Sequence, residues 1–231
     1  MTISLFLSHL AYGALRGIRN LTFTLALPVS VVHAEPVTIF ALGDSLTAGY
    51  GLAEDEGLVP QLNAWLKAEG TDAEVINGGV SGDTSAGGLS RLAWSLTPEV
   101  DALIVTLGGN DLLRGLPPAV TRDNIAAILT EADSRGLPVL LIGMKAPGNF
   151  GPDYKAAFDT LYPDLATQFG AIHIDSFFGL IDPNAADPGA IAQFMQSDGI
   201  HPSSEGVKRV VRVLGPQVQA LIAKTVEADT P

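Results

Sequence analysis

Three short segments of this sequence carry side chains that could perform hydrolytic chemistry together. They are Gly43–Leu46 (GDSL), Gly108–Asp111 (GGND) and Asp198–Pro202 (DGIHP). The first offers a hydroxyl nucleophile in Ser45, the second offers a side-chain amide donor in Asn110, and the third offers an acid and a base. A serine hydroxyl is a weak nucleophile until a positioned base takes its proton, so these residue types belong together in acyl transfer. The three segments predict a hydrolase that forms an acyl-enzyme on Ser45.

The general base can be identified by elimination among the four histidines. His9 and His33 lie in the N-terminal segment that we interpret below as a signal peptide. His173 lies in the alternating run 171–175, which favours a strand position and a packed ring. His201 lies in a loop bounded by glycine and proline, and loops on a rigid scaffold commonly present functional side chains. His201 is therefore the predicted base.

Asp198 precedes His201 by three residues and is the candidate acid. If these residues form a single turn, the carboxylate can reach the imidazole Nδ1–H and fix its tautomer, which leaves Nε2 for Ser45. The alternative is structural: an Asx-type turn in which Asp198 caps the final helix. The presence of Ser45 and Asn110 elsewhere in the chain favours the catalytic interpretation.

Acyl transfer also requires hydrogen-bond donors for the developing oxyanion. Gly82 lacks a side chain and can direct its backbone N–H into the site, while Asn110 can donate from its amide. The backbone N–H of Ser45 supplies a third donor. The structural alternatives are a turn glycine before a helix capped by Asp83 or Thr84, and a turn asparagine at position 110. The coincidence of these residues at neighbouring strand ends favours an oxyanion hole.

The two other acidic residues of the first two segments, Asp44 and Asp111, are interpreted as helix caps without a catalytic role. The sequence has no HExxH motif, no paired histidines and no carboxylate cluster, so we expect no metal. It also lacks a Walker loop and a GxGxxG motif, and we expect no nucleotide site. The GxSxG elbow of the α/β-hydrolases is absent around Ser45.

The composition is that of a folded acidic protein. The chain has 231 residues, 47% of them hydrophobic, which is enough to bury a full core in one domain over residues 35–231. Its formal net charge of -12 and pI near 4.5 provide no basic surface for nucleic acid. The absence of cysteine excludes disulfides, a cysteine nucleophile and thiolate metal sites. The oligomeric state is not indicated.

Residues 1–34 differ from the rest of the chain and are interpreted as a secretory signal peptide. They contain Arg16 and Arg19 but no acidic residue, followed by an apolar run over 21–32 and the small-residue pattern VHA. The run is short for a membrane span, and we expect no stable membrane insertion. The prediction is a periplasmic or secreted bacterial protein that is cleaved near Ala34. An uncleaved anchor and a mis-assigned start codon are the alternatives.

Apolar runs typical of strands alternate with segments of helical spacing. The predicted strands, which are short and rich in aliphatic residues, cover 37–42, 73–76, 102–107, 138–142 and 171–174. The predicted helices, which repeat apolar residues at helical spacing, cover 58–68, 124–135, 154–169 and 203–223. This alternation predicts an α/β fold with a parallel sheet and helices on both faces.

The predicted sheet brings the chemical segments together. In parallel α/β folds, functional sites lie beyond the carboxyl ends of the strands. Ser45 follows the first predicted strand, the segment 79–84 follows the second, and Asn110 follows the third. Asp198 and His201 lie in the loop before the last helix. All of these residues are therefore expected at one edge of the sheet.

The same residues resemble the sequence blocks of the SGNH, or GDSL, hydrolase family. The matching parts, in the order typical of the family, are 43–49 (GDSLTAG), Gly82, 108–111 (GGND) and 198–202 (DGIHP). The resemblance extends over nearly the whole chain after the predicted signal peptide. It is strongest to the bacterial periplasmic group of thioesterase I, lysophospholipase L1 and arylesterase.

The resemblance implies a flavodoxin-like, three-layer α/β/α fold with a five-stranded parallel sheet. It implies a triad of Ser45, Asp198 and His201, with Gly82 and Asn110 completing the oxyanion hole. It also implies a serine esterase that acts on small acyl esters and thioesters, namely aryl esters, acyl-CoA and lysophospholipids. Neither a metal nor an organic cofactor is implied.

The substrate is indicated less sharply than the chemistry. The segment 144–149 (MKAPGN) departs from the family pattern and places Lys145 near the site, so the acyl length is not specified. Apolar residues that could line the acyl site, with core packing as the alternative, are Phe150, Leu180, Ile181 and Phe194. Two other functions are alternatives: a carbohydrate O-deacetylase on the same scaffold, and a non-catalytic acyl- or lipid-binding protein. An Asp–His pair beside a serine argues against the second.

Overall fold

Five parallel strands form the central sheet, in the order β2-β1-β3-β4-β5. The computed structural model describes residues 36–182 and 188–228, so the predicted signal peptide over 1–34 lies outside the described residues. The strands, each of which coincides with a predicted one, are β1 Val37–Gly43, β2 Ala73–Gly79, β3 Ala102–Thr106, β4 Val139–Ile142 and β5 Ile172–Ile174. Strand β2 continues three residues beyond its predicted end at Ile76.

The pairing of the strands aligns their carboxyl ends. Strands β3 and β4 are buried at every residue, because aliphatic runs without polar alternation are suited to cover by helices on both faces. Strand β1 lies between β2 and β3, and its last residue, Gly43, pairs with Gly79 and with Thr106. The three loops that follow these strands therefore start at the same level of the sheet.

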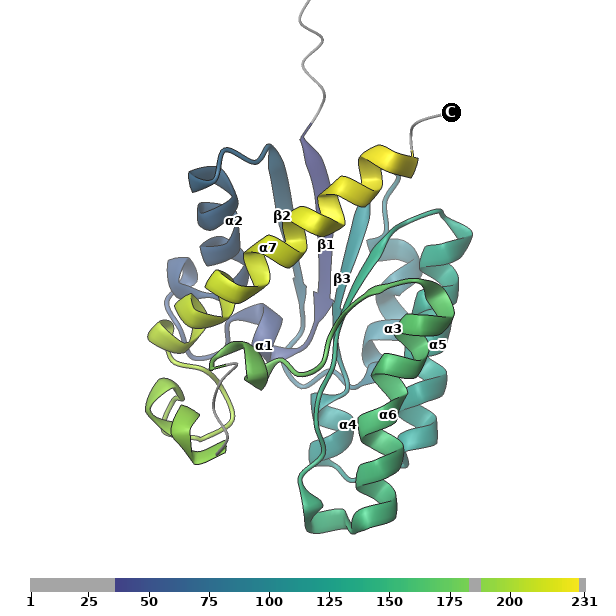
Figure 1. Cartoon of the computed structure of the whole chain (residues 1–231), viewed down its shortest axis with the longest axis vertical. Coiled ribbons are helices and arrows are strands. Elements are labelled where there is room, and N and C mark those ends of the chain that lie inside the picture. The colour runs from purple at the N-terminus through teal and green to yellow at the C-terminus, as the bar shows by residue number, and fades with distance from the viewer. Residues whose placement is uncertain (1–35, 183–187, 229–231) are drawn as a thin grey trace, which may run out of the picture. The chain divides into compact units, whose positions relative to one another are not determined.

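Helices cover both faces of the sheet and complete the three-layer α/β/α architecture (Figure 1). One layer consists of α2 (Leu58–Ala68) and α7 (Ser204–Ala228), which pack together. The other layer consists of α3 (Ser85–Ser95), α5 (Pro118–Ser134) and α6 (Pro152–Phe169). Right-handed crossovers place α2 on one face and α3, α5 and α6 on the other, because the chain moves one way from β1 to β2 and the opposite way from β2 to β5. The fold is flavodoxin-like, as the sequence predicts.

The contact between α2 and α7 depends on apolar spacing and on one glycine. Leu58, Leu62 and Leu66 recur at helical spacing along α2, and all three are buried. Trp65 of α2 lies against Gly215 of α7, where a Cβ atom would clash with the indole ring. The glycine therefore allows the two helices to approach closely.

Several helices differ from the sequence prediction in extent. Helices α1 (Ser45–Ala48), α3 and α4 (Gly109–Leu113) are anticipated only through their caps, and α4 begins two residues before its predicted cap, Asp111. Helix α5 begins at Pro118, six residues before the predicted start. A proline fits there, because the N–H that it lacks would have no partner in the first turn of a helix.

Within the described residues, no helix is long and apolar enough to cross a membrane.

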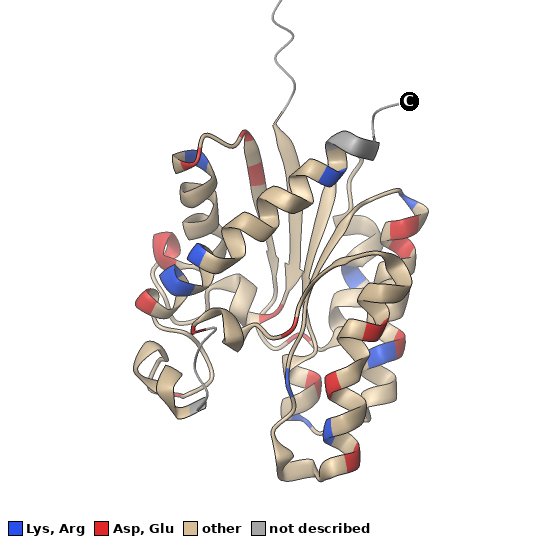
Figure 2. Cartoon of the chain, viewed as in Figure 1, with Lys and Arg blue, Asp and Glu red and all other residues tan. Residues whose placement is uncertain are grey.

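The carboxyl ends of the strands form the lower edge of the sheet in Figure 1, where α1 and α4 begin. Acidic residues gather at this edge, with basic residues on the neighbouring helices (Figure 2). Asp44, Asp83 and Asp111 belong to the segments that follow β1, β2 and β3. The edge predicted to hold the site is therefore also rich in ionisable groups.

Candidate active site

Ser45 is the first residue of α1, and Asp44 alone separates it from the end of β1. Asp44 caps this helix, as predicted, because its Oδ1 accepts the Leu46 N–H at 3.0 Å. Gly43 is required at the strand end, since a Cβ atom there would clash with the Thr47 side chain. Strand, cap and helix together fix the Ser45 hydroxyl at the carboxyl edge of the sheet.

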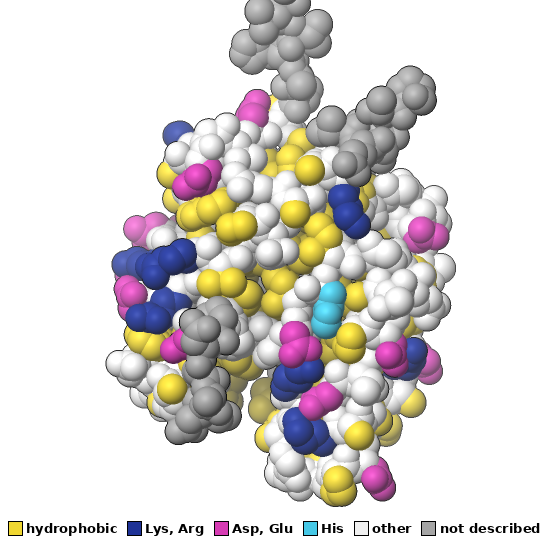
Figure 3. Space-filling view, viewed as in Figure 1, with side chains coloured by type: hydrophobic (Ala, Val, Ile, Leu, Met, Phe, Trp, Pro, Cys, Tyr) yellow, Lys and Arg dark blue, Asp and Glu magenta, His cyan; other side chains and the backbone are white. Residues whose placement is uncertain are grey.

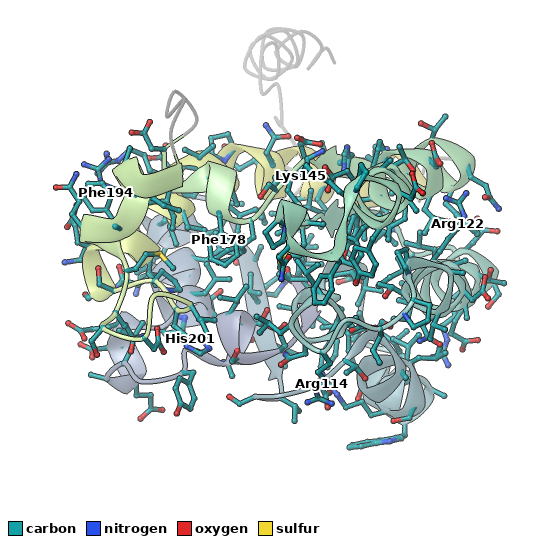
Figure 4. The ribbon with its side chains drawn as sticks, turned by 90° about the horizontal axis from the view of Figure 1, so that it is seen from below. Arg114, Arg122, Lys145, Phe178, Phe194 and His201 are labelled. Carbon is teal, nitrogen blue, oxygen red and sulfur yellow. The ribbon has the colours of Figure 1, made fainter. Side chains whose placement is uncertain are left out.

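The loop before α7 places His201 against Ser45. The distance from His201 Nε2 to Ser45 Oγ is 2.8 Å, and the distance from His201 Nδ1 to Asp198 Oδ2 is 2.7 Å. Figure 4, which is seen from below, shows where His201 lies at the carboxyl edge. The structure thus joins three residues in one hydrogen-bonded chain, although Ser45 and His201 are 156 positions apart in the sequence.

Asp198 uses its two carboxylate oxygens differently. Oδ2 contacts the His201 ring, while Oδ1 accepts the N–H groups of Ile200 at 2.9 Å and of His201 at 3.0 Å. The bond with the His201 side chain, followed by these backbone bonds, lowers the pKa of Asp198 to about 2. An Asx turn and the histidine contact therefore coexist. The predicted alternative that Asp198 caps the last helix is wrong, because Ser203 Oγ accepts the Gly206 N–H at 3.2 Å instead.

Gln196 holds this loop in place, and the sequence does not single it out. Its backbone N–H donates to the His201 carbonyl at 2.7 Å, and its Nε2 donates to the carbonyls of Tyr50 at 2.8 Å and Pro202 at 3.0 Å. The ring of Tyr50 in turn lies on the His201 ring, with centroids 4.6 Å apart. A loop glutamine gives no sequence signal for this role, because its partners are backbone carbonyls that any residue can supply.

Gly82 and Asn110 both line the cleft beside the serine. Gly82 has φ of 87°, a backbone conformation that favours glycine. Asn110 lies in the first turn of α4, and its Nδ2 donates to the Asp83 carbonyl at 3.0 Å and to Asp44 Oδ2 at 3.3 Å. The structure therefore brings both predicted donors to the side of Ser45, with the Asn110 amide already engaged.

The loop that carries Gly82 is fixed by two arginines that the sequence prediction omits. Arg91 of α3 pairs with the Asp83 carboxylate at 2.7 Å and donates to the Gly43 carbonyl at 2.9 Å. Arg114, at the end of α4, donates to the Gly82 carbonyl at 2.8 Å. Figure 4 shows Arg114 on the other side of the carboxyl edge from His201. These contacts leave the Gly82 loop little freedom to move.

Asp111 connects three helices and does not cap its own, so that prediction is wrong. It is fully buried, its Oδ2 accepts the Ser85 N–H at 2.7 Å, and its Oδ1 accepts the hydroxyls of Ser85 at 2.5 Å and Thr121 at 3.2 Å. The physical reason is its place inside α4, from which its side chain reaches the start of α3. Thr84 is the cap of α3, because its hydroxyl accepts the Gly87 N–H at 3.3 Å.

Asp44 is a buried ionisable group beside Ser45. Burial raises the pKa of its carboxyl to about 6, against the opposing effects of hydrogen bonds from Leu46 and Asn110 and of the nearby His201. With a pKa near 6, the group is mainly ionised at neutral pH. A carboxylate therefore lies next to the Asn110 amide under those conditions.

A cleft of about 390 Å³ opens beside Ser45 and His201. Its apolar walls come from Leu46, Leu112, Leu113, Met144, Phe178 and Ile200. A second cavity of about 890 Å³ shares Lys145, Phe178 and Gly199 with the cleft. Figure 3 shows the front face hollowed at its lower edge, and Figure 4 shows Phe178 and Lys145 on the same side of the edge. The walls of the cleft beside Ser45 are therefore mostly hydrocarbon.

None of the apolar residues predicted for the acyl site belongs to the described lining of these two cavities. Leu180 and Ile181 are buried in the core. Phe194 packs under the guanidinium of Arg209, 3.7 Å from the ring centroid, and Phe150 is 43% exposed. The two cavities therefore contradict that prediction: Leu180, Ile181 and Phe194 pack in or against the core, which is the alternative of ordinary packing, whereas Phe150 is exposed.

Lys145 and His173 are two further residues whose positions the sequence predicts. Lys145 lies at the site, as predicted, where it lines both cavities and pairs with Asp175 at 2.5 Å. His173 lies in β5, and burial lowers the pKa of its ring.

In the described parts of the chain, no cluster of three or more His, Asp or Glu side chains could hold a metal ion.

The sequence of the whole domain matches a known family. The model for the GDSL-like lipase/acylhydrolase family matches residues 41–209, a range that includes every site residue named above. The chain belongs to this family. The GDSL hydrolase is therefore an enzyme of the carboxylic ester hydrolase class, and the family predicted from the short sequence blocks is confirmed.

Individual relatives of the GDSL hydrolase match it over most of their length. Esterase TesA of Pseudomonas aeruginosa is 38% identical over 199 residues, which cover 86% of this chain and 96% of TesA. Thioesterase 1/protease 1/lysophospholipase L1 of Escherichia coli K12 is 34% identical over 186 residues, which cover 80% of this chain and 85% of that enzyme. The structure of AlinE4, an SGNH-hydrolase family esterase, is 40% identical, with a TM-score of 0.65 over 81% of this chain and 97% of that one.

Proposed function

We propose that this GDSL hydrolase cleaves acyl esters and thioesters through an acyl-enzyme on Ser45. The observation that carries the proposal is the chain of hydrogen bonds from Asp198 through His201 to Ser45, with lengths of 2.7 and 2.8 Å. A base within reach of a hydroxyl, itself oriented by a carboxylate, is the arrangement that activates a serine. The low pKa of Asp198 keeps its carboxylate ionised at neutral pH, where it stabilises the imidazolium.

The reaction begins when His201 Nε2 takes the Ser45 proton while Oγ attacks the acyl carbonyl carbon. The tetrahedral oxyanion collapses, the bond to the alcohol or thiol breaks, and His201 returns its proton to the leaving oxygen or sulfur. A water molecule then attacks the acyl-enzyme with His201 as its base, which releases the carboxylic acid and free Ser45. Asp198 orients the ring throughout and takes no proton itself. Neither a metal nor an organic cofactor is needed for any step.

We assign the oxyanion hole to the backbone N–H groups of Ser45 and Gly82 and to Asn110 Nδ2. Donors aimed at developing charge contribute about 10²–10³-fold each in acyl-transfer enzymes. Ser45 is in the first turn of α1, where backbone N–H groups have no partner inside the helix. Arg114 donates to the Gly82 carbonyl, a contact that restrains the loop carrying the Gly82 N–H.

The proposed substrates are small aryl esters, acyl thioesters such as acyl-CoA, and lysophospholipids. The names of the relatives, an esterase and a thioesterase/lysophospholipase, support this range. The apolar walls of the cleft support it as well, because each buried methylene of an acyl chain contributes about 0.8 kcal/mol without regard to the leaving group. A site that binds chiefly the acyl part accepts several leaving groups.

Steady-state assays with p-nitrophenyl esters of increasing chain length, acyl-CoA and lysophosphatidylcholine test this function. Protein lacking residues 1–34 should hydrolyse members of all three classes, and Ser45→Ala should lose turnover on each. Ser134→Ala, which removes an exposed hydroxyl at the end of α5, is the matched control and should keep full activity. Equal rates for wild type and Ser45→Ala would exclude Ser45 as the nucleophile.

Two other outcomes would replace the proposal. Activity confined to acetyl esters and increased on acetylated glycans would identify a carbohydrate O-deacetylase. Binding of fatty acids or lysophospholipids without turnover of any substrate would identify a non-catalytic binding protein.

We also propose that residues 1–34 are removed on export, so that the enzyme acts in the periplasm or outside the cell. The basic Arg16 and Arg19, the apolar run and the small-residue end support this proposal. N-terminal sequencing of the exported enzyme should find a chain that begins near Glu35. Full-length protein in the membrane fraction would favour an uncleaved anchor instead.

A further inference from the structure

Asp44 is the buried polar group at the site that the proposed mechanism does not use. Its side chain is 2% exposed, and its Oδ1 accepts the Leu46 N–H at 3.0 Å. Its Oδ2 lies 3.3 Å from Asn110 Nδ2. A helix cap needs only one oxygen. The contact of the second oxygen with Asn110 requires a separate explanation.

Both hydrogens of Asn110 Nδ2 have acceptors within the protein. One is donated to the Asp83 carbonyl at 3.0 Å, and the other to Asp44 Oδ2 at 3.3 Å. A side-chain amide has two N–H donors and no more. An oxyanion can therefore receive a hydrogen bond from Asn110 only if it displaces one of these acceptors or shares a hydrogen with it.

Of the two Asn110 N–H groups, the one that donates to Asp44 is the one that can donate to an oxyanion instead. The bond to Asp83 is shorter, and Asp83 is anchored by the ion pair of its carboxylate with Arg91 at 2.7 Å. The contact with Asp44 is longer than the usual range of about 2.7–3.2 Å for N–H···O bonds, and it is correspondingly weak. Asp44, Ser45 and Asn110 all line the same cleft, so this hydrogen lies on the substrate side.

We propose that Asp44 is a positioning residue that orients the Asn110 amide for the oxyanion. The inference rests on the proposed function of Ser45 and Asn110. An ionised carboxylate is an acceptor only, so it attracts Nδ2 of Asn110 and repels the amide oxygen. Asp44 thus selects the orientation in which a donor, and not an acceptor, points into the cleft. Asp44 Oδ2 accepts the second N–H of Asn110, and in the transition state this N–H instead donates its hydrogen bond to the oxyanion.

The surrounding residues keep the Asp44 carboxylate in the position that this role requires. The Leu46 N–H fixes one oxygen. Gly109 leaves space for the other, since a Cβ atom there would lie 3.3 Å from Asp44 Oδ2, closer than most such contacts. Because Gly109 directly precedes Asn110, the same backbone segment both accommodates the carboxylate and presents the amide to it.

Asp44→Ser and Asp44→Asn separate the positioning role from the capping role. Serine is a good helix cap and can keep the bond from the Leu46 N–H, but its side chain is too short to reach Asn110. In aspartate the two contacts use different oxygens, whereas asparagine has an NH2 group in place of one of them, so it loses the bond from either Leu46 or Asn110. Both variants should fold, and both should lose the orientation of the amide.

We expect each Asp44 variant to lower kcat for p-nitrophenyl butyrate by about 10–100-fold, a part of the effect of losing an oxyanion donor outright. KM should change by less than about threefold, because the amide acts on the charge that develops in the transition state. In an Asn110→Ala background, the same Asp44 substitutions should have little further effect, since a positioning residue has nothing left to position. Circular dichroism and urea unfolding verify that each protein is folded.

Four results would overturn the inference. The first is a wild-type kcat in folded Asp44→Asn or Asp44→Ser, and the second is a change in KM alone. The third is a double variant whose loss of kcat equals the product of the losses in the Asp44 and Asn110 single variants. The fourth is failure of both Asp44 variants to fold. If only one Asp44 variant folds, its effect on kcat with and without Asn110→Ala provides the test. The Ser45→Ala assay keeps the proposals distinct: loss of turnover there, with wild-type kcat in both Asp44 variants, defeats the positioning role alone.

Discussion

Asp198→Asn is expected to lower kcat by about 10³–10⁴-fold while the fold is retained. The asparagine oxygen can take the place of Oδ1, which accepts the N–H groups of Ile200 and His201. Its NH2 group then replaces Oδ2, 2.7 Å from His201 Nδ1. A donor at that point requires Nδ1 to be an acceptor, so the ring proton moves to Nε2. His201 can then no longer take the proton of Ser45.

The rate of p-nitrophenyl ester hydrolysis between pH 5 and 9 measures this effect. The matched control is Asp101→Asn, at the opposite end of the sheet, where Asp101 Oδ2 accepts the Thr38 N–H at 2.7 Å, and this variant should retain the wild-type kcat. Because the pKa of Asp198 is lowered to about 2, its carboxylate stays ionised throughout that range and is lost only as the pH falls through about 2. A loss smaller than about tenfold in Asp198→Asn would contradict the proposed dependence of His201 on the carboxylate.

The sequence predicts the place of the candidate site because its residues are tied to local features of the chain. Ser45, Gly82 and Asn110 each follow a short aliphatic run, and such runs are recognisable without knowledge of tertiary contacts. Once the runs form one parallel sheet, their carboxyl ends meet at one edge. The catalytic roles of these residues are proposals that the kinetic experiments address, but their proximity follows from the topology.

Residues that act through long-range contacts could not be predicted in this way. Arg91 reaches back to the Gly43 carbonyl, and Gln196 reaches the Tyr50 carbonyl, across 48 and 146 positions respectively. Their partners are backbone carbonyls, which every residue has, so neither contact can be recognised from the sequence. The lining of the cleft is unpredictable for a related reason, since it depends on how the loops pack.

The two sequence interpretations of Asp198 show a different limit. From the sequence, the Asx turn and the contact with His201 are alternatives, yet a carboxylate has two oxygens and Asp198 uses one for each. The turn brings the carboxylate and the ring together, so the structural feature produces the functional one. Gly82 is similar, because the turn that demands a glycine also exposes a backbone N–H at the cleft.

Asp111→Ala is expected to lower the free energy of unfolding by about 3–5 kcal/mol, which is large for a single substitution. The carboxylate is fully buried and accepts three hydrogen bonds, from the Ser85 N–H and from the hydroxyls of Ser85 and Thr121. Alanine would leave these donors buried without an acceptor, at a cost of about 1–3 kcal/mol for each unsatisfied group. The loss would also separate the starts of α3 and α5 from α4.

Urea unfolding at pH 7 measures this loss, with Asp164→Ala as the matched control. Asp164 pairs with Arg122 at 3.1 Å, but both side chains are largely exposed, so the control should lose less than about 1 kcal/mol. Asp111→Asn should fall between the two, because it keeps one acceptor oxygen of the original pair. If Asp111→Ala were no more destabilised than Asp164→Ala, the three helices would not depend on this carboxylate. Because α4 also carries Asn110, the same contacts link the stability of the fold to the placement of the proposed oxyanion donor.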